Sequence, residues 1–249
     1  MNGQMYQIAC IVAAARKALK SGKEICYKPE KYTNKLSFQI LLSENGEVIE
    51  LSVSDWLENL KEKGLKDLKL FCPISVNDRG ILGFSNTTQS SILCFYKDGK
   101  AGYFLPNWKS ASAGRGWDVT YTEYEWERPF QDLPHYENNI EEFKDILIRI
   151  EDLAIKIECD NFAKVFHSAR NFLLDPESGK GLSYPQIPPQ NQNIFRAASV
   201  ADVFGAMGSW NDEAGWLAQD KGLGQQYDEL SDQLLRNIRL AILFAINEW

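Results

Sequence analysis

The sequences LSFQIL, residues 36–41, and EVIELSV, residues 47–53, are short runs rich in apolar side chains. Such runs, bounded by turn residues, are typical of β-strands. The turn Glu44-Asn45-Gly46 stands between the two runs, and an Asn-Gly pair readily adopts the positive φ angles of a tight hairpin. The stretch therefore predicts a β-hairpin in the first half of the chain.

Strand signals continue beyond the hairpin and are separated by turn sequences such as Lys97-Asp98-Gly99-Lys100. The further predicted strands cover residues 68–72, 81–84, 91–96, 101–105 and 117–126. Strands joined by short turns run in opposite directions, so we expect an antiparallel sheet. Helical spacing at residues 6–20 and 55–63, the second capped by Ser54, predicts one or two helices that cover the sheet.

The periodicity changes across residues 129–138, where Pro129 and Pro134 interrupt both patterns. Long helices are predicted after this boundary at residues 139–157, 160–174 and 227–249, with a short helix at 195–204 and a proline-rich loop at 175–193. We therefore expect an α+β fold with two subdomains. Residues 1–130 would form an N-terminal antiparallel β-sheet with its covering helices, packed on a C-terminal helical subdomain of residues 131–249.

The composition is that of an ordinary globular protein, with 44% hydrophobic and 24% charged residues in 249. The longest uncharged apolar stretch, residues 240–247, is far shorter than the roughly 20 residues that cross a bilayer, so no membrane association is expected. The first apolar stretch lacks the flanks of a secretory signal, and the five cysteines show no CxxC spacing. These features favour reduced, buried thiols in a cytoplasmic protein.

The net charge of −7 is unevenly distributed along the chain. Residues 1–130 contain 17 Lys and Arg against 15 Asp and Glu, a net charge of +2, whereas residues 131–249 contain 10 against 19, a net charge of −9. Phosphate binding requires a basic surface, so nucleic acid is not an expected partner. A basic protein would be attracted to the acidic half, although an excess of carboxylates also serves solubility alone.

The residues that usually carry catalysis or metal binding are sparse. The chain contains two histidines, His135 and His167, and no cysteine lies close to either in the sequence. Zinc sites need three or four such ligands, usually in closely spaced pairs, so we predict neither a metal nor a cofactor. Carboxylates far apart in the sequence can still converge in a fold, which keeps a hydrolase open as an alternative.

Three tryptophans, Trp108, Trp117 and Trp126, lie near a glycine-rich loop at residues 110–116. Alternation along residues 117–126 directs Trp117 and Tyr121 to one face of the sheet and Tyr124 and Trp126 to the other. One set is expected in the core, and the other is a candidate aromatic binding patch. Cross-strand packing of both sets is the alternative.

A second candidate binding site is the tight turn that contains Ser209, Trp210, Asn211 and Asp212. The short polar side chains of Ser209, Asn211 and Asp212 can hydrogen-bond either a ligand or neighbouring backbone N–H groups. In the second interpretation, Trp210 fills the helical core while Asn211 and Asp212 cap the helix that follows.

The run FGAMGSWND, residues 204–212, lies between predicted helices and resembles small bacterial proteins marked by FGGMGS-x-ND. Ala206 departs from the second glycine of that motif, which matters where the backbone needs a positive φ. The resemblance covers about residues 140–249. It implies no catalytic residue, but some of the similar proteins belong to bacterial toxin and immunity loci.

We therefore predict a cytoplasmic, immunity-like protein that binds a basic, toxin-like protein. This prediction rests on the acidic half, on the missing catalytic residues and on the resemblance. The alternative is a hydrolase or small-ligand-binding enzyme with a site between the two subdomains. That site would use Ser209, Asn211 and Asp212, together with His167.

Overall fold

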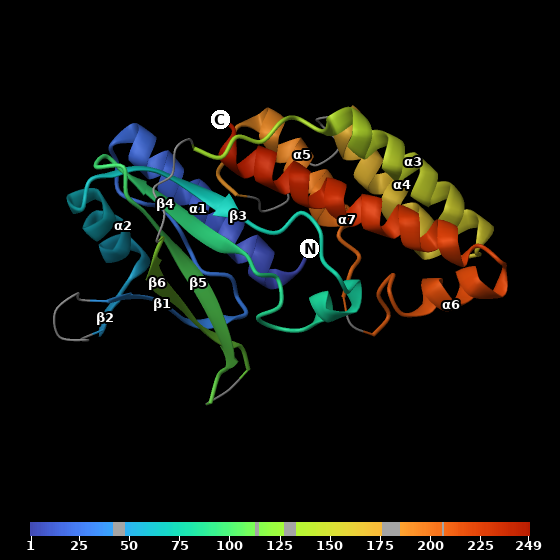
Figure 1. Cartoon of the computed structure of the whole chain (residues 1–249), viewed down its shortest axis with the longest axis horizontal. Helices are drawn as coiled ribbons and strands as arrows, with labels where there is room; N and C mark the ends of the chain where they lie inside the picture. Colours follow the sequence, from blue (N-terminus) through green and yellow to red (C-terminus); the bar gives the residue numbers. More distant parts are fainter. Residues whose placement is uncertain (42–47, 113–114, 127–132, 176–184, 206) are drawn as a thin grey trace. The chain divides into compact units, whose positions relative to one another are not determined.

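A computed structural model describes residues 1–41, 48–112, 115–126, 133–175, 185–205 and 207–249 of the chain (Figure 1). The predicted turn at Glu44-Asn45-Gly46 lies outside these residues, as do Ala206 and parts of the expected boundary and of the proline-rich loop. The predicted α+β class is confirmed, because a six-stranded sheet accompanies the helices.

The strands of the sheet are β1 (Thr33–Leu41), β2 (Val48–Leu51), β3 (Leu65–Phe71), β4 (Ser91–Tyr96), β5 (Ala101–Ser110) and β6 (Trp117–Glu125). Their order across the sheet is β2-β1-β6-β5-β4-β3. The predicted pairing of β1 with β2 is confirmed, and it is antiparallel. The expectation of a wholly antiparallel sheet is wrong, because β1 and β6 run parallel. No hairpin joins these two strands, so turn chemistry does not determine their relative direction.

Two helices, α1 (Gly3–Ser21) and α2 (Val53–Glu62), contribute to the core beside the sheet. The ring of Phe38 on β1 stacks against Trp56 of α2 at 4.1 Å and against Tyr121 of β6 at 4.9 Å between ring centroids. The Tyr121 hydroxyl donates to Oε1 of Gln7 in α1 over 3.2 Å. The cap of α2 is Ser52 rather than the predicted Ser54, because the Ser52 hydroxyl accepts from the Asp55 amide.

The strand predicted at residues 81–84 is wrong, since Arg79–Gly83 forms a 3₁₀-helix, η1. Side chains, rather than a neighbouring strand, supply hydrogen-bond partners to the backbone groups of this segment. The Asp78 carboxylate accepts from the Gly80 amide over 2.8 Å, and the Thr87 hydroxyl donates to the carbonyls of Ile81 and Phe84 over 2.8 and 2.7 Å. Such local side-chain bonds compete with a sheet ladder, and here they replace it.

The remaining helices are α3 (Ile140–Lys156), α4 (Asp160–Leu174), α5 (Pro189–Ala201), α6 (Glu213–Asp220) and α7 (Gly224–Asn247). Helix α3 packs on α4 as predicted, and α5 and α7 complete the group, as Figure 1 shows. The short helix predicted at residues 195–204 instead begins at Pro189, a residue that suits the first helical position. Helix α6 was not predicted. No helix among the described residues is long and apolar enough to span a membrane.

The chain divides into two compact units. The helical unit comprises Met1–Tyr6, Cys72–Thr88 and His135–Trp249, and the sheet unit comprises Gln7–Phe71 and Gln89–Pro134. The segment 72–88, which contains η1, is therefore part of the same compact unit as helices that lie much later in the sequence. The cysteine side chains differ in exposure: Cys72, Cys94 and Cys159 are buried, whereas Cys26 is exposed.

The stacked core of the sheet unit yields a stability prediction. Phe38→Ala removes a fully buried ring and should lower the free energy of unfolding by about 3–5 kcal/mol. Urea denaturation followed by circular dichroism measures this change. Phe71→Ala, on the edge strand β3 and partly exposed, is the matched control and should cost less than about 1 kcal/mol. Equal losses for the two variants would contradict the prediction.

Candidate functional site

The turn at residues 205–212 is held by its own polar groups. The Ser209 hydroxyl donates to the Gly205 carbonyl over 2.9 Å, and an Asp212 carboxylate oxygen accepts from the Gly208 amide over 3.0 Å. Gly208 has a φ of +76°, a conformation that favours glycine. Asp212 precedes α6 but makes no side-chain cap bond to it. The hydrogen bonds of Ser209 and Asp212 therefore close the turn.

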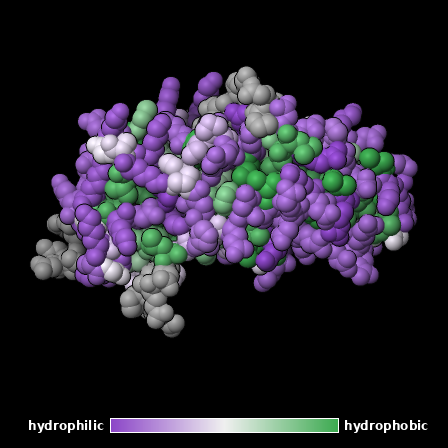
Figure 2. All heavy atoms as spheres, turned by 90° about the horizontal axis from the view of Figure 1, so that it is seen from above, coloured by the Kyte–Doolittle hydropathy of each residue, from purple (hydrophilic) through white to green (hydrophobic). Residues whose placement is uncertain are grey.

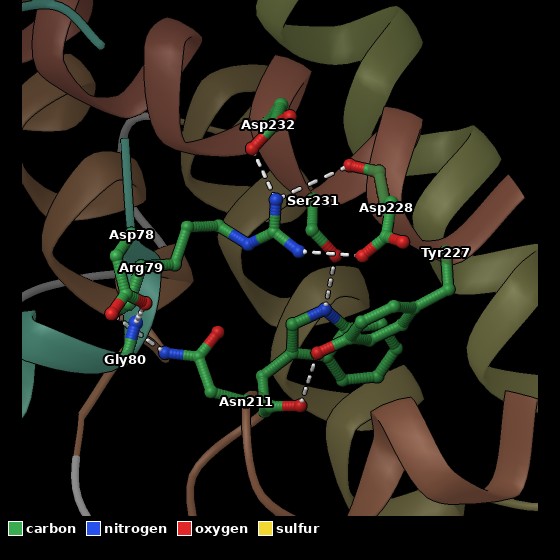
Figure 3. Close-up of polar contacts among 9 residues, drawn as sticks. Asp78, Arg79, Gly80, Asn211, Tyr227, Asp228, Ser231 and Asp232 are labelled. Carbon is green, nitrogen blue, oxygen red and sulfur yellow. Dashed lines mark hydrogen bonds and ion pairs between the residues drawn. The ribbon is translucent and has the colours of Figure 1, made fainter. Parts of the chain in front are cut away.

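Trp210 is fully buried and joins the turn to the helices behind it. Its ring lies edge-on to Phe162 and Phe166, each at 5.2 Å between centroids. The indole N–H donates to the Ser231 hydroxyl over 2.8 Å, and the Trp210 carbonyl accepts from the Tyr227 hydroxyl over 2.9 Å (Figure 3). Burial raises the pKa of Tyr227, which keeps this phenol protonated and able to donate.

Arg79 of η1 links the same turn to helix α7. Its guanidinium pairs with Asp228 over 3.0 Å and with Asp232, and it lies 5.8 Å from the centre of the Tyr227 ring (Figure 3). The Arg79 backbone carbonyl accepts from the Asn211 side-chain amide over 2.9 Å. Asn211 thus binds the backbone of η1, while the carboxylates of α7 bind the Arg79 side chain. We call these contacts the Arg79 clasp.

The side chains that the turn and α6 present to solvent include large apolar ones. Met207 is 96% exposed and Trp216 is 67% exposed. Helix α6 buries Ala214 and Ala218 and turns Trp216 to the opposite side. Figure 2 shows a largely hydrophilic surface with hydrophobic residues exposed between hydrophilic ones. Tryptophan is enriched among the residues that dominate binding at protein interfaces, so the exposed Trp216 marks α6 as a candidate contact surface.

The three candidate tryptophans of the sheet unit have different environments. Trp108 is buried and lies edge-on to Trp117 at 6.0 Å between centroids. Trp126 is 43% exposed and packs at 5.8 Å against Tyr103, which stacks on Tyr124. The predicted division of the aromatic residues between two faces is therefore visible, with Trp126 on the exposed side. The structure does not bring the three tryptophans into a single patch.

His167, the histidine of the enzymatic alternative, lies on α4. Its Nδ1 atom is 3.0 Å from a carboxylate oxygen of Glu151, and Arg170 pairs with the other oxygen over 3.1 Å. Among the described residues, the structure records no contact between His167 and the polar side chains of the turn. His135 pairs separately with Glu248 over 3.0 Å. The residues considered for an enzyme are therefore occupied in separate contacts.

A small cavity lies in the helical unit beside Asp202 and Arg239. Its volume is about 20 Å³, and apolar side chains such as Leu235 and Ile238 supply much of its wall. A cavity of this size holds one water molecule. Within the described ranges, no group of three or more His, Cys, Asp or Glu side chains is arranged to hold a metal ion.

Comparison with family models, with curated proteins and with solved structures finds no match to this chain. The resemblance to proteins with the FGGMGS-x-ND motif therefore stays a prediction.

Sequence reasoning singled out the turn but missed the residues that bind it. Asp228 and Asp232 are four positions apart on α7, a spacing that places two carboxylates on one helix face and signals a nearby cation. Nothing local identifies that cation as Arg79, which lies 153 residues from Asp232. Trp216 also lacks a local signal, because α6 is too short to show a clear period.

The bond between Trp210 and Ser231 yields a second stability prediction. Ser231→Ala leaves a buried indole N–H without its acceptor and should destabilise the protein by about 1–3 kcal/mol. Ser168→Ala is the control, because the Ser168 hydroxyl is exposed and bonds the Lys164 carbonyl within its own helix. Chemical denaturation of Trp210→Phe, Ser231→Ala and the double variant forms a cycle. Additive losses in this cycle would show that the bond contributes nothing.

Proposed function

We propose that this is a protein-binding protein of the immunity type, which masks a basic, toxin-like partner. The observation that carries the proposal is a contrast between the polar side chains of the turn, which are hydrogen-bonded within the chain, and the apolar side chains of the turn and α6, which are exposed. The polar side chains bond neighbouring backbone groups, while Met207 and Trp216 face solvent. Exposed tryptophan and methionine are enriched in protein interfaces, where they fill pockets on the partner.

The distribution of charge supports a basic partner. Residues 131–249 carry a net charge of −9, and several carboxylates of the helices are exposed. An acidic surface accelerates the encounter with a cationic protein and disfavours nucleic acid. The hydrolase alternative gains no comparable support, because Ser209, Asn211 and His167 already bind other groups of the chain.

A reducing compartment such as the cytoplasm is part of the proposal. Its support is the burial of Cys72, Cys94 and Cys159 as thiols. Proteins of oxidising compartments commonly pair such residues in disulfides.

The test is co-expression with the proteins encoded by neighbouring genes. The wild-type protein should rescue growth from a toxic neighbour and form a complex that can be isolated. Met207→Ala combined with Trp216→Ala should weaken that complex at least about tenfold, as expected for interface hot spots, and leave stability nearly unchanged.

The matched control is Ile155→Ala combined with Leu174→Ala, which also removes two exposed apolar side chains, here from α3 and α4. Its complex should keep wild-type affinity as measured by titration calorimetry. Failure of every neighbouring protein to bind or to be neutralised would refute the proposed function.

A further inference from the structure

Helix α6 presents a tryptophan between two carboxylates. Glu213 precedes Trp216 by three positions and Asp220 follows it by four, so all three side chains lie on one side of the helix. All three are exposed, while Ala214 and Ala218 occupy the buried side. We call Glu213, Trp216 and Asp220 the α6 face.

The carboxylates of the α6 face lie outside the ion pairs that the structure describes in the helical unit. In the described part of the chain, neither Glu213 nor Asp220 forms an ion pair. Lys221, the cation next to Asp220 in the sequence, bonds instead to Glu158 over 2.6 Å. The nearby Asp212 differs, because its carboxylate accepts from the Gly208 amide. The α6 face thus exposes two uncompensated negative charges beside an indole ring.

This combination fits a cationic side chain. The face of an indole attracts an ammonium or guanidinium group, and tryptophan is the strongest aromatic partner for such a cation. Flanking carboxylates add charge-assisted hydrogen bonds to the same group. Exposed Met207, in the turn that leads into α6, adds a flexible apolar contact of the kind that accommodates varied partners.

We propose that the α6 face binds a basic amphipathic segment of the partner protein. A lysine or arginine of that segment rests on Trp216 between Glu213 and Asp220, and an apolar residue of the segment contacts Met207. The inference rests on the proposed function and specifies its partner chemistry. A second copy of this acidic chain is disfavoured by like-charge repulsion, and nucleic acid by the same carboxylates.

The test measures binding of an amphipathic leucine–lysine peptide by titration calorimetry. Trp216→Ala and the pair Glu213→Gln with Asp220→Asn should each weaken binding about tenfold, because each removes one part of the cation site. Acetylation of the peptide lysines should abolish the difference between these variants and the wild type. Thermal unfolding verifies that all variants stay folded, as expected for exposed positions.

The control for net charge is Glu142→Gln with Asp152→Asn on α3, which neutralises two exposed carboxylates elsewhere in the helical unit. This control should stay within about twofold of the wild type, because distant surface charges are screened by salt. A loss as large as that of the α6 pair would mean diffuse attraction and would overturn the inference. An unchanged affinity for Trp216→Ala would overturn it as well.

The two proposals fail in different ways. If a neighbouring protein binds all α6 variants as tightly as the wild type, the α6 face is not its site and the proposed function still stands. If no neighbouring protein binds or is neutralised, the proposed function itself fails, whatever the peptide does.

Discussion

A buried indole N–H is most stable when it has a hydrogen-bond acceptor, and in the helical unit Ser231 supplies one to Trp210. Much of the surrounding arrangement depends on this hydrogen bond. Ser231 must face inward from α7, which places Tyr227, one helical turn earlier, where its hydroxyl reaches the Trp210 carbonyl. Both the side chain and the backbone carbonyl of Trp210 therefore form hydrogen bonds with α7.

The Arg79 clasp extends this arrangement to a segment distant in the sequence. Asp228 and Asp232 are exposed, so each ion pair by itself contributes little in water. The guanidinium also lies near the Tyr227 ring, and the Asn211 amide bonds the Arg79 backbone. Several modest contacts converge on one residue, and together they position η1 without a strand partner.

These internal contacts change the interpretation of the turn. The sequence presents Ser209, Asn211 and Asp212 as possible ligand-binding groups, but each already bonds a backbone group of the chain. A turn with its polar groups occupied presents its apolar residue, Met207, and the helix it introduces, α6. The candidate surface is therefore displaced by a few residues from the recognisable motif, onto a helix with little sequence signal.

The sequence by itself determined the elements whose pattern is local. Turn residues indicate the strands β1 and β2, and periodicity indicates the helices α3, α4 and α7 and the placement of Tyr121 and Tyr124 on opposite faces. Only the tertiary structure decided that β1 runs parallel to β6, that residues 81–84 are not a strand, and that Arg79 meets Asp228 and Asp232. The physical reason is separation along the chain. A periodic pattern records which side of an element is buried, whereas contacts between distant segments depend on how packed surfaces fit together.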